Sequence, residues 1–198
     1  MKNPYFFGYG SLVNRATHDY PDAVHAKAKG WRRLWRHTRL RPVAFLTVVA
    51  DEDSTIEGLI AGVPNADWAA LDQREWAYQR INASDDVSHD LSHQPDVALY
   101  AVPHDQSHRP NVKHPILLSY IDVVVQGYLS EFGQDGAQRF FDTTDGWDTP
   151  IINDRAAPMY PRHQPLSKDD RHFVDEQLGA LSAQVEQGEQ SGLTLKRF

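Results

Sequence analysis

The sequence contains no cysteine among its 198 residues. Disulfide bonds, thiolate nucleophiles and cysteine-ligated metals are therefore excluded together, and any chemistry must use other side chains. The sequence also lacks an apolar run of about 18 residues, which a membrane-spanning helix needs. Its N-terminus does not have the basic, apolar and small-residue order of a secretory signal. We therefore expect a cytoplasmic protein with no membrane partner.

Acidic residues outnumber basic ones, and the formal net charge is -7. One segment, residues 25–41, nevertheless holds seven cationic residues and no acid: Lys27, Lys29, Arg32, Arg33, Arg36, Arg39 and Arg41. Trp31 and Trp35 lie among them, so a patch that binds phosphates and stacks on bases is one hypothesis. Alternation places Trp31, Arg33 and Trp35 on one strand face, where arginine stems cover apolar surface. We favour a basic strand within an acidic protein, with no nucleic-acid partner.

The first half of the chain is rich in β-forming residues, and the second half has helical periodicity. The pattern predicts strands over residues 4–7, 28–40, 43–49, 55–63, 78–81 and 97–103. A helix capped by Asn65 or Asp67 is expected through residue 77. The residues are 40% hydrophobic, enough to bury one core. Strands followed by helices indicate an α+β fold with a curved, mainly antiparallel sheet.

Three helical segments are predicted in the second half. The longest apolar segment, residues 116–132, ends at Gly133, which suits a left-handed terminator. A short helix is expected over residues 136–144, and Ser167 begins a last helix. Between them, residues 145–165 hold four prolines and predict an irregular surface excursion. The tail from Gln184 is expected to fray.

The histidines form two pairs with i, i+4 spacing, His89 with His93 and His104 with His108, and His114 follows. On a helix this spacing places two imidazoles on one face, as metal sites require. The flanking residues are polar and interrupted by proline, so neither pair has a convincing helix. We favour solvated loop histidines over a metal site.

The stretch FGYGSLV breaks the first predicted strand early, with glycines on both sides of Tyr9. Ser11 does not lie in a G-x-S-x-G elbow because Val13 occupies the last position, so a serine hydrolase is not favoured. One interpretation is a tight turn. The other is a loop whose backbone N–H groups receive an anionic or carbonyl oxygen, since glycine permits close approach of a ligand.

Glu75 lies near the end of the predicted helix, between Trp68 and Trp76. The negative end of the helix dipole and the indoles would disfavour its charged form and make it a useful general base. The alternative is an exposed carboxylate paired with Arg74 or Arg80. Both interpretations stay open from position alone.

Together these stretches resemble the gamma-glutamyl cyclotransferase superfamily, in its bacterial branch. The resemblance lies in FGYGSL at residues 7–12, GLIAGV at residues 58–63, and LDQRE at residues 71–75 followed by Tyr78 and Arg80. It implies an α+β fold in which a mixed, mainly antiparallel curved sheet or small barrel is surrounded by helices. It further implies a single domain over residues 1–198, with a core of about 5–130 and a proline-rich and helical extension over 145–198.

The resemblance also implies an activity: metal- and cofactor-independent conversion of a γ-glutamyl amino acid, peptide or amine to 5-oxoproline and the free amine. The substrate α-amine attacks its own γ-carbonyl, and one carboxylate can move the proton between the two nitrogens. Glu75 resembles the catalytic acid/base, and Arg80 could orient it. The residues that resemble the substrate-binding loop and pocket are Tyr9, Gly10, Ser11, Leu12, Tyr78, Tyr100 and Tyr120.

A second hypothesis is a non-catalytic module whose cavity holds a small amine or carboxylate ligand unchanged. Residues 145–165 lie outside the resemblance to the core and resemble an elaboration that covers the pocket mouth or binds a neighbour. The sequence specifies neither the leaving group nor the oligomeric state.

Overall fold

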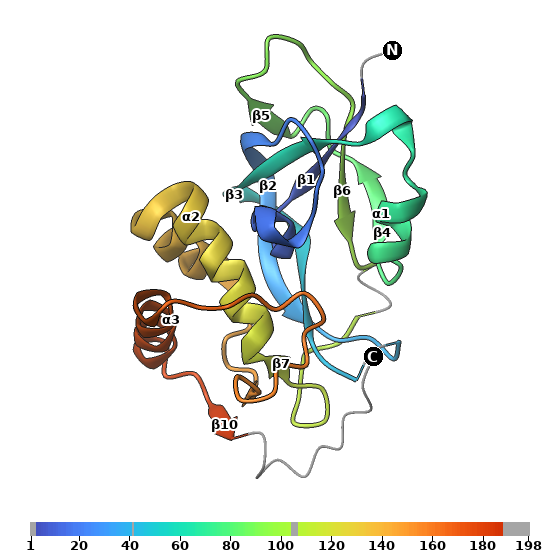
Figure 1. The fold of residues 1–198 in the computed structure, drawn as a ribbon. Helices are drawn as coiled ribbons and strands as arrows, with labels where there is room; N and C mark the ends of the chain where they lie inside the picture. Colours follow the sequence, from blue (N-terminus) through green and yellow to red (C-terminus); the bar gives the residue numbers. More distant parts are fainter. Residues whose placement is uncertain (1–2, 41, 104–106, 188–198) are drawn as a thin grey trace.

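The computed structural model describes residues 3–40, 42–103 and 107–187, and Figure 1 shows its fold. A curved mixed sheet with the strand order β4-β6-β1-β3-β2-β5 forms the centre, and β8 pairs with β2 off this path. These strands are β1 Tyr5–Gly8, β2 Val24–Arg36, β3 Phe45–Gly62, β4 Gln79–Asn82, β5 Val87–His89, β6 Val97–Ala101 and β8 Thr144–Asp145. Antiparallel pairs predominate, although β1 runs parallel to β6 and β2 parallel to β8. The predicted α+β fold with a mainly antiparallel curved sheet is confirmed.

The long β2–β3 hairpin differs from the prediction. Residues 43–49 and 55–63 were expected as separate strands, but β3 runs through both. The polar residues between them, 51–54, bulge out of β3 opposite Gly30 of β2, whose φ of +81° suits glycine. Pairing shifts there from Lys29 with Thr55 to Trp31 with Ala50. A polar stretch that looks like a turn between two strands is therefore an irregularity within one strand. β2 itself begins and ends four residues earlier than the predicted 28–40.

Within the described residues, three helices accompany the sheet: α1 Ala69–Arg74, α2 Leu118–Asp142 and α3 Lys168–Ala180. Gly133 has φ +67° but only interrupts α2, so the predicted short helix over 136–144 is its continuation. The Ser167 side chain caps α3 as predicted, because it accepts a hydrogen bond from the Asp170 N–H. In Figure 1, α2 and α3 lie together on one side of the large sheet. Three 3-10 turns complete the list: η1 Ser11–Val13, η2 Arg15–Thr17 and η3 Pro64–Ala66.

The segment after α2, predicted to be irregular, is more regular than expected. It contributes β9 Ile151–Asn153 to a second sheet with β7 Ile116–Leu117 and β10 Val185–Gln187. The expected fraying from Gln184 is wrong for residues 185–187, which pair with β9, and residues 188–198 lie outside the described residues. The Arg155 guanidinium ties the segment to α2 through Asp122 at 2.7 Å and to α3 through Asp175 at 2.6 Å.

The face of β2 that carries Trp31, Arg33 and Trp35 turns inward. Trp35 and Arg33 are both 1% exposed, and Trp35 packs edge-on against Trp147. Neither side chain can reach a nucleic acid. The hypothesis of a patch that binds phosphates and stacks on bases therefore loses two of its central residues, Arg33 and Trp35. Arg41, from the same stretch, lies outside the described residues. Among the described helices, none has the length and apolar character to cross a membrane.

Candidate active site

The loop that follows β1, residues 9–12, folds back tightly because of two glycines. A methyl group on Gly8 would lie 2.6 Å from the Leu12 Cβ, and one on Gly58 would lie 2.3 Å from the Gly8 carbonyl oxygen. Neither distance is compatible with a side chain, so both positions require glycine for close backbone approach. The strand breaks at Gly8, and η1 begins at Ser11, just beyond the end of β1.

This loop lines a small inner cavity of about 30 Å³. The cavity brings together all eight residues predicted for the site: Tyr9, Gly10, Ser11, Leu12, Glu75, Tyr78, Tyr100 and Tyr120. They come from the end of β1, the end of α1, β6 and α2. Residues more than 100 positions apart in the chain thus meet at one place.

The hydroxyl groups of three cavity tyrosines already have protein partners. Tyr9 donates to the Tyr100 carbonyl oxygen at 2.5 Å, Tyr78 to the Leu46 carbonyl oxygen at 2.8 Å, and Tyr100 to the Asp72 carboxylate at 2.5 Å. Burial raises the pKa of Tyr9 well above its ordinary value, and burial together with Asp72 raises the pKa of Tyr100. Both tyrosines therefore stay neutral.

The Tyr120 hydroxyl lies beside the loop. A methyl group placed on Gly10 would be 3.1 Å from the Tyr120 Oη, so the hydroxyl nearly touches the Gly10 backbone. The Tyr120 ring packs between Trp35 and Tyr160, with centroid distances of 5.8 and 4.8 Å.

Glu75 follows the last residue of α1 and is held there by its own N–H, which donates to the Leu71 carbonyl oxygen at 2.9 Å. Its side chain is 16% exposed, and one carboxylate oxygen lies 3.3 Å from the Arg74 Nε. Glu75 is therefore paired with Arg74 but is not the exposed carboxylate of the alternative interpretation. The Arg80 guanidinium pairs with the Asp72 carboxylate at 3.0 Å, and the expectation that it could orient Glu75 stays a prediction.

Arg74 is a site residue that the sequence analysis treated only as a partner of Glu75. Its guanidinium donates to the Thr17 carbonyl oxygen at 3.0 Å and to the Ser11 Oγ at 3.3 Å. The side chain is 8% exposed. Arg74 therefore links the Glu75 carboxylate to the loop of residues 9–12. The sequence shows that Arg74 is next to Glu75, but it does not indicate the hydrogen bond from Arg74 to Ser11.

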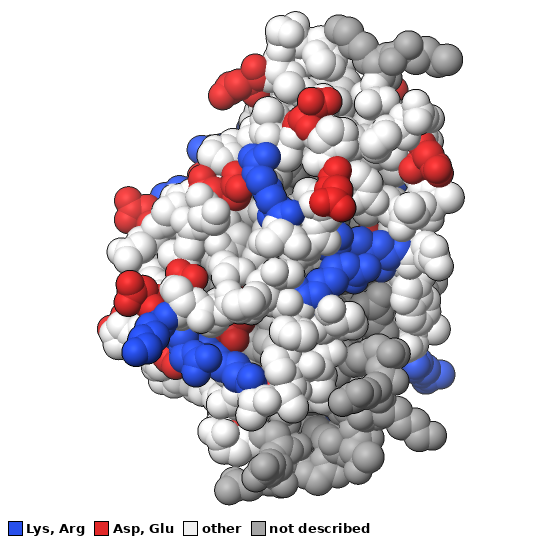
Figure 2. Space-filling view, viewed as in Figure 1, with Lys and Arg blue, Asp and Glu red and all other residues white. Residues whose placement is uncertain are grey.

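Glu75 also lines a wider outer cleft of about 710 Å³, which shares Ser11, Glu75, Tyr78 and Tyr120 with the inner cavity. Its remaining walls were not predicted: Val43, Ala44, Phe45, Gln73, Arg74, Trp76, Leu117, Tyr160, Pro161 and Arg162. Trp76 is 55% exposed. Residues 160–162 belong to the proline-rich segment, so this segment forms part of the mouth of the pocket. Figure 2 shows a broad patch of Lys and Arg at the middle of the face drawn there, with separate acidic patches above it.

The histidines do not form a metal centre within the described part of the chain, where no group of three or more His, Asp or Glu side chains is arranged to hold an ion. His93 packs edge-on against Tyr5 at 6.3 Å. His37 stacks on His114 at a centroid distance of 4.0 Å, and His108 lies 5.5 Å from His37. His104 lies outside the described residues.

Comparisons with known proteins identify the family of the chain. The model of the ChaC-like protein family matches residues 4–116, more than half of the chain. The protein therefore belongs to the ChaC-like family. The match includes the loop of residues 9–12 and Glu75 but ends before Tyr120 and the 160–162 wall of the outer cleft.

Solved structures share the fold at low sequence identity. A gamma-glutamyl cyclotransferase aligns with a TM-score of 0.56 at 13% identity over 88% of this chain and 99% of its own. YkqA from Bacillus subtilis aligns at 0.55 and 19% identity over 70% of this chain and 53% of its own. The human protein loc79017, described as uncharacterized, aligns at 0.55 and 12% identity over 88% and 99% of the two chains. A search of curated proteins found no significant match.

Proposed function

We propose that the protein converts a γ-glutamyl compound to 5-oxoproline and a free amine, with Glu75 as general acid/base. The observation that carries the proposal is the position of Glu75, where the inner cavity meets the outer cleft beside the loop of residues 9–12. Membership of the ChaC-like family and the cyclotransferase fold support the reaction class.

The reaction needs one proton carrier. The glutamyl α-ammonium gives a proton to the Glu75 carboxylate, and the freed amine attacks the γ-carbonyl carbon to close a five-membered ring. The bond between that carbon and the leaving nitrogen then breaks, and the leaving nitrogen takes the proton from Glu75. The new ring nitrogen gives up its second proton to the Glu75 carboxylate, which passes it to the departing amine, so that the lactam is neutral and the amine leaves as an ammonium. Atoms and charge balance without a cofactor, and a positioned acid/base of this kind contributes about 10²–10⁴-fold to the rate.

The loop of residues 9–12 would hold the glutamyl group folded for attack. Within the described residues, the Gly10 N–H donates to no acceptor, although Gly10 is buried and lines the cavity. A buried N–H that faces a cavity can bind the substrate α-carboxylate. Holding the amine near the carbonyl converts proximity into rate.

The leaving group would lie in the outer cleft. The inner cavity has room for about one water molecule, so a glutamyl group must extend from the loop toward the cleft. Arg74 and Arg162 line the cleft, where Glu75 is the only acid among the lining residues. This charge balance favours a leaving amine that carries a carboxylate, such as an amino acid or peptide, over a simple amine.

The test is the release of 5-oxoproline, measured by mass spectrometry, from glutathione, γ-glutamyl-alanine and a γ-glutamyl amine. Glu75→Gln keeps the shape of the side chain and removes the proton carrier, so we expect kcat to fall about 10²–10⁴-fold with an unchanged melting temperature. Glu52→Gln, at an exposed position of β3, is the matched control and should behave as the wild type.

Two results would contradict the proposal. Equal activity of Glu75→Gln and the wild type would remove Glu75 from the chemistry. A wild-type protein that binds a γ-glutamyl compound and returns it unchanged would favour the binding-module hypothesis instead.

A further inference from the structure

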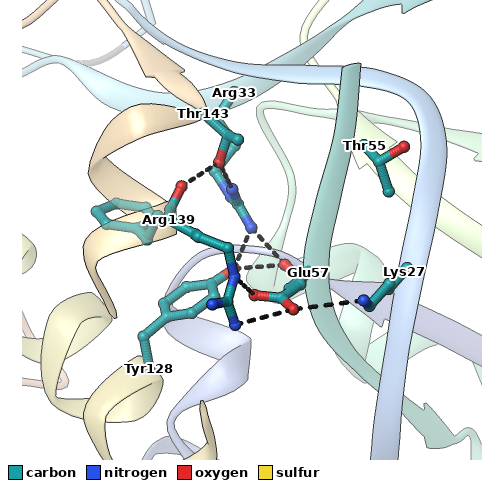
Figure 3. A pocket seen from close by; sticks show the side chains of 8 residues that line it. Lys27, Arg33, Thr55, Glu57, Tyr128, Arg139 and Thr143 are labelled. Atoms are coloured by element: carbon teal, nitrogen blue, oxygen red, sulfur yellow. Dashed lines mark hydrogen bonds and ion pairs between the residues drawn. The ribbon is translucent and has the colours of Figure 1, made fainter. Parts of the chain in front are cut away.

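Arg33 is a buried arginine that the reaction described above does not use. It lies in β2, is 1% exposed and points between β3 and α2, as Figure 3 shows. Its guanidinium donates to the Thr143 Oγ1 at 2.7 Å, to the Glu57 carbonyl oxygen, to the Tyr128 hydroxyl and, through Nε, to the Tyr9 carbonyl oxygen at 3.0 Å.

All the hydrogen-bond acceptors recorded for Arg33 in the described part of the chain are neutral. The nearby Glu57 carboxylate is occupied by Arg139 at 2.9 Å and by Lys27 at 3.7 Å, two largely exposed side chains whose contacts with it are drawn in Figure 3. Arginine stays charged at any physiological pH. Burying a charge that has no opposite charge directly bonded to it lowers the stability of the folded state. If the only role of residue 33 were structural, an apolar side chain would give a more stable protein.

The Tyr9 carbonyl is the acceptor that connects Arg33 to the candidate site. Tyr128 also reaches it, because its hydroxyl oxygen lies 3.0 Å from the Tyr9 oxygen and 2.7 Å from the Glu57 oxygen. The Tyr9 side chain is fixed separately by its bond to the Tyr100 carbonyl oxygen. Both ends of Tyr9 are therefore held before any substrate binds.

The peptide group that joins Tyr9 to Gly10 has its oxygen on Arg33. Because the peptide is trans, its N–H points away from that oxygen, and Gly10 lines the cavity. A cation on the carbonyl oxygen polarises a peptide group and makes its N–H a stronger donor, because hydrogen bonds in a chain strengthen one another in a poorly solvated interior. The positive charge also stabilises an anion bound on the far side of the peptide.

We propose that Arg33, together with Tyr128, is a positioning residue that holds the Tyr9–Gly10 peptide and strengthens its N–H for an anionic group of the substrate. This inference rests on the proposed function, since the anionic group is the glutamyl α-carboxylate. Arg33 acts from behind the loop and does not touch the substrate.

The test compares two substrates, a γ-glutamyl compound with a free α-carboxylate and the same compound with an α-carboxamide. The variants are Arg33→Met, which removes the charge at similar volume, Arg33→Lys, which retains it, and Tyr128→Phe, which removes the second donor to Tyr9 and one acceptor of Arg33. Arg139→Met is the matched control, because Arg139 lines the pocket drawn in Figure 3 together with Arg33 but bonds the Glu57 side chain and not Tyr9.

For the wild type, kcat/KM should be larger for the carboxylate substrate. In Arg33→Met we expect the ratio of kcat/KM between the carboxylate and the carboxamide substrate to fall about 10- to 100-fold, as for the loss of a hydrogen bond to a charged group. Most of this change should be a higher KM for the carboxylate substrate. Arg33→Lys should recover part of it, and Tyr128→Phe should lose less than Arg33→Met. Arg139→Met should retain it.

Equal losses on both substrates in Arg33→Met and Tyr128→Phe would overturn the inference and leave Arg33 as scaffold. If Arg33→Met does not fold, Tyr128→Phe decides, since it removes a single oxygen atom. A wild type that is inactive on every substrate would overturn the proposed function. Hydrogen–deuterium exchange of the backbone amides of residues 9–13 would then decide the inference. Faster exchange in Tyr128→Phe than in Arg139→Met would support the role of Arg33 and Tyr128 in holding the Tyr9–Gly10 peptide, and equal exchange would refute it.

Discussion

The inner cavity and the outer cleft are built differently although they share four residues. The inner cavity lies mostly within the family match and is made from strand ends and one short loop that is held by hydrogen bonds to Tyr9. The outer cleft takes Tyr160, Pro161 and Arg162 from the proline-rich segment, and Trp76 at its edge is 55% exposed.

This difference separates two tasks. A site that must hold reacting atoms within a fraction of an ångström needs a rigid support, and glycines at positions 8 and 58 and the Arg33 bonds supply one. A site that selects a leaving group can be formed by a segment outside that support. The Arg155 ion pairs anchor this segment to α2 and α3 rather than to the central sheet. We therefore expect changes in the inner region to affect every substrate, and changes in the outer region to affect only some.

Among the substitutions that compare the two regions, Gly58→Ala is expected to have the largest effect. The added methyl group would lie 2.3 Å from the Gly8 carbonyl oxygen and 2.8 Å from the Phe7 Cζ, so the end of β1 must move. Such overpacking costs about 1–3 kcal/mol. Because the loop of residues 9–12 moves with β1, we expect kcat/KM to fall about 100-fold for all γ-glutamyl substrates. Steady-state kinetics on the three-substrate panel and thermal unfolding measure both effects.

Gly179→Ala is the control for that substitution. A methyl group on Gly179, in α3, meets no atom within 4 Å, and alanine in a helix is favoured by up to about 1 kcal/mol. Its activity should match the wild type. If Gly58→Ala were as active as Gly179→Ala, the inner region would be less rigid than the contacts indicate.

Much of the fold could be predicted because period-2 and period-3.6 patterns depend on local sequence. Ser167 was identified as a cap from its position before an acidic first turn, and the end of β1 from the glycines around Tyr9. The bulge at residues 51–54 could not be found, since it depends on how β2 pairs with β3. The short strands β7 and β10 depend on pairing with β9 in the same way.

The candidate site could be predicted as far as the family resemblance extends, and all eight predicted residues line one cavity. Arg33 was misread as part of a basic surface, although the alternation that puts it on the face of Trp35 was visible. Two tryptophans on a strand face indicate that the face is buried, and the arginine between them must then be buried too. Tyr160 and Arg162 gave no signal, because they reach the cleft only through tertiary packing.

A selective effect is expected from Arg162→Met in the outer cleft. Arg162 makes no ion pair among the described residues, so its charge is available to a carboxylate on the leaving group. We expect about a tenfold loss of kcat/KM for glutathione and γ-glutamyl-alanine, and no loss for a γ-glutamyl amine without a carboxylate. A uniform loss across the panel would mean that the cleft does not act separately from the inner cavity.

The smallest effect concerns the contact that follows the loop of residues 9–12. Arg15, in η2, donates two hydrogen bonds to the Glu131 carboxylate on α2, at 2.7 and 2.9 Å, and His25 lies 3.2 Å from it. Burial raises the pKa of Glu131, but the hydrogen bonds and charges of Arg15 and His25 outweigh burial and lower it. A lowered folded-state pKa gives stability that is present above the unfolded pKa and is lost as the pH falls through the folded pKa.

Glu131→Gln should therefore be less stable than the wild type at pH 7, by at most about 1 kcal/mol, because the pair is partly exposed. That corresponds to a melting temperature lower by about 2–4 °C. The gap should close as the pH falls below the ordinary carboxyl range, which thermal unfolding of both proteins between neutral and acidic pH would reveal. A gap that stays constant with pH would show that the substituted glutamine side chain disturbs packing on α2 and that the ion pair contributes nothing. In either case activity should stay near the wild-type value, because this contact supports the segment behind the loop and not the Tyr9–Gly10 peptide itself.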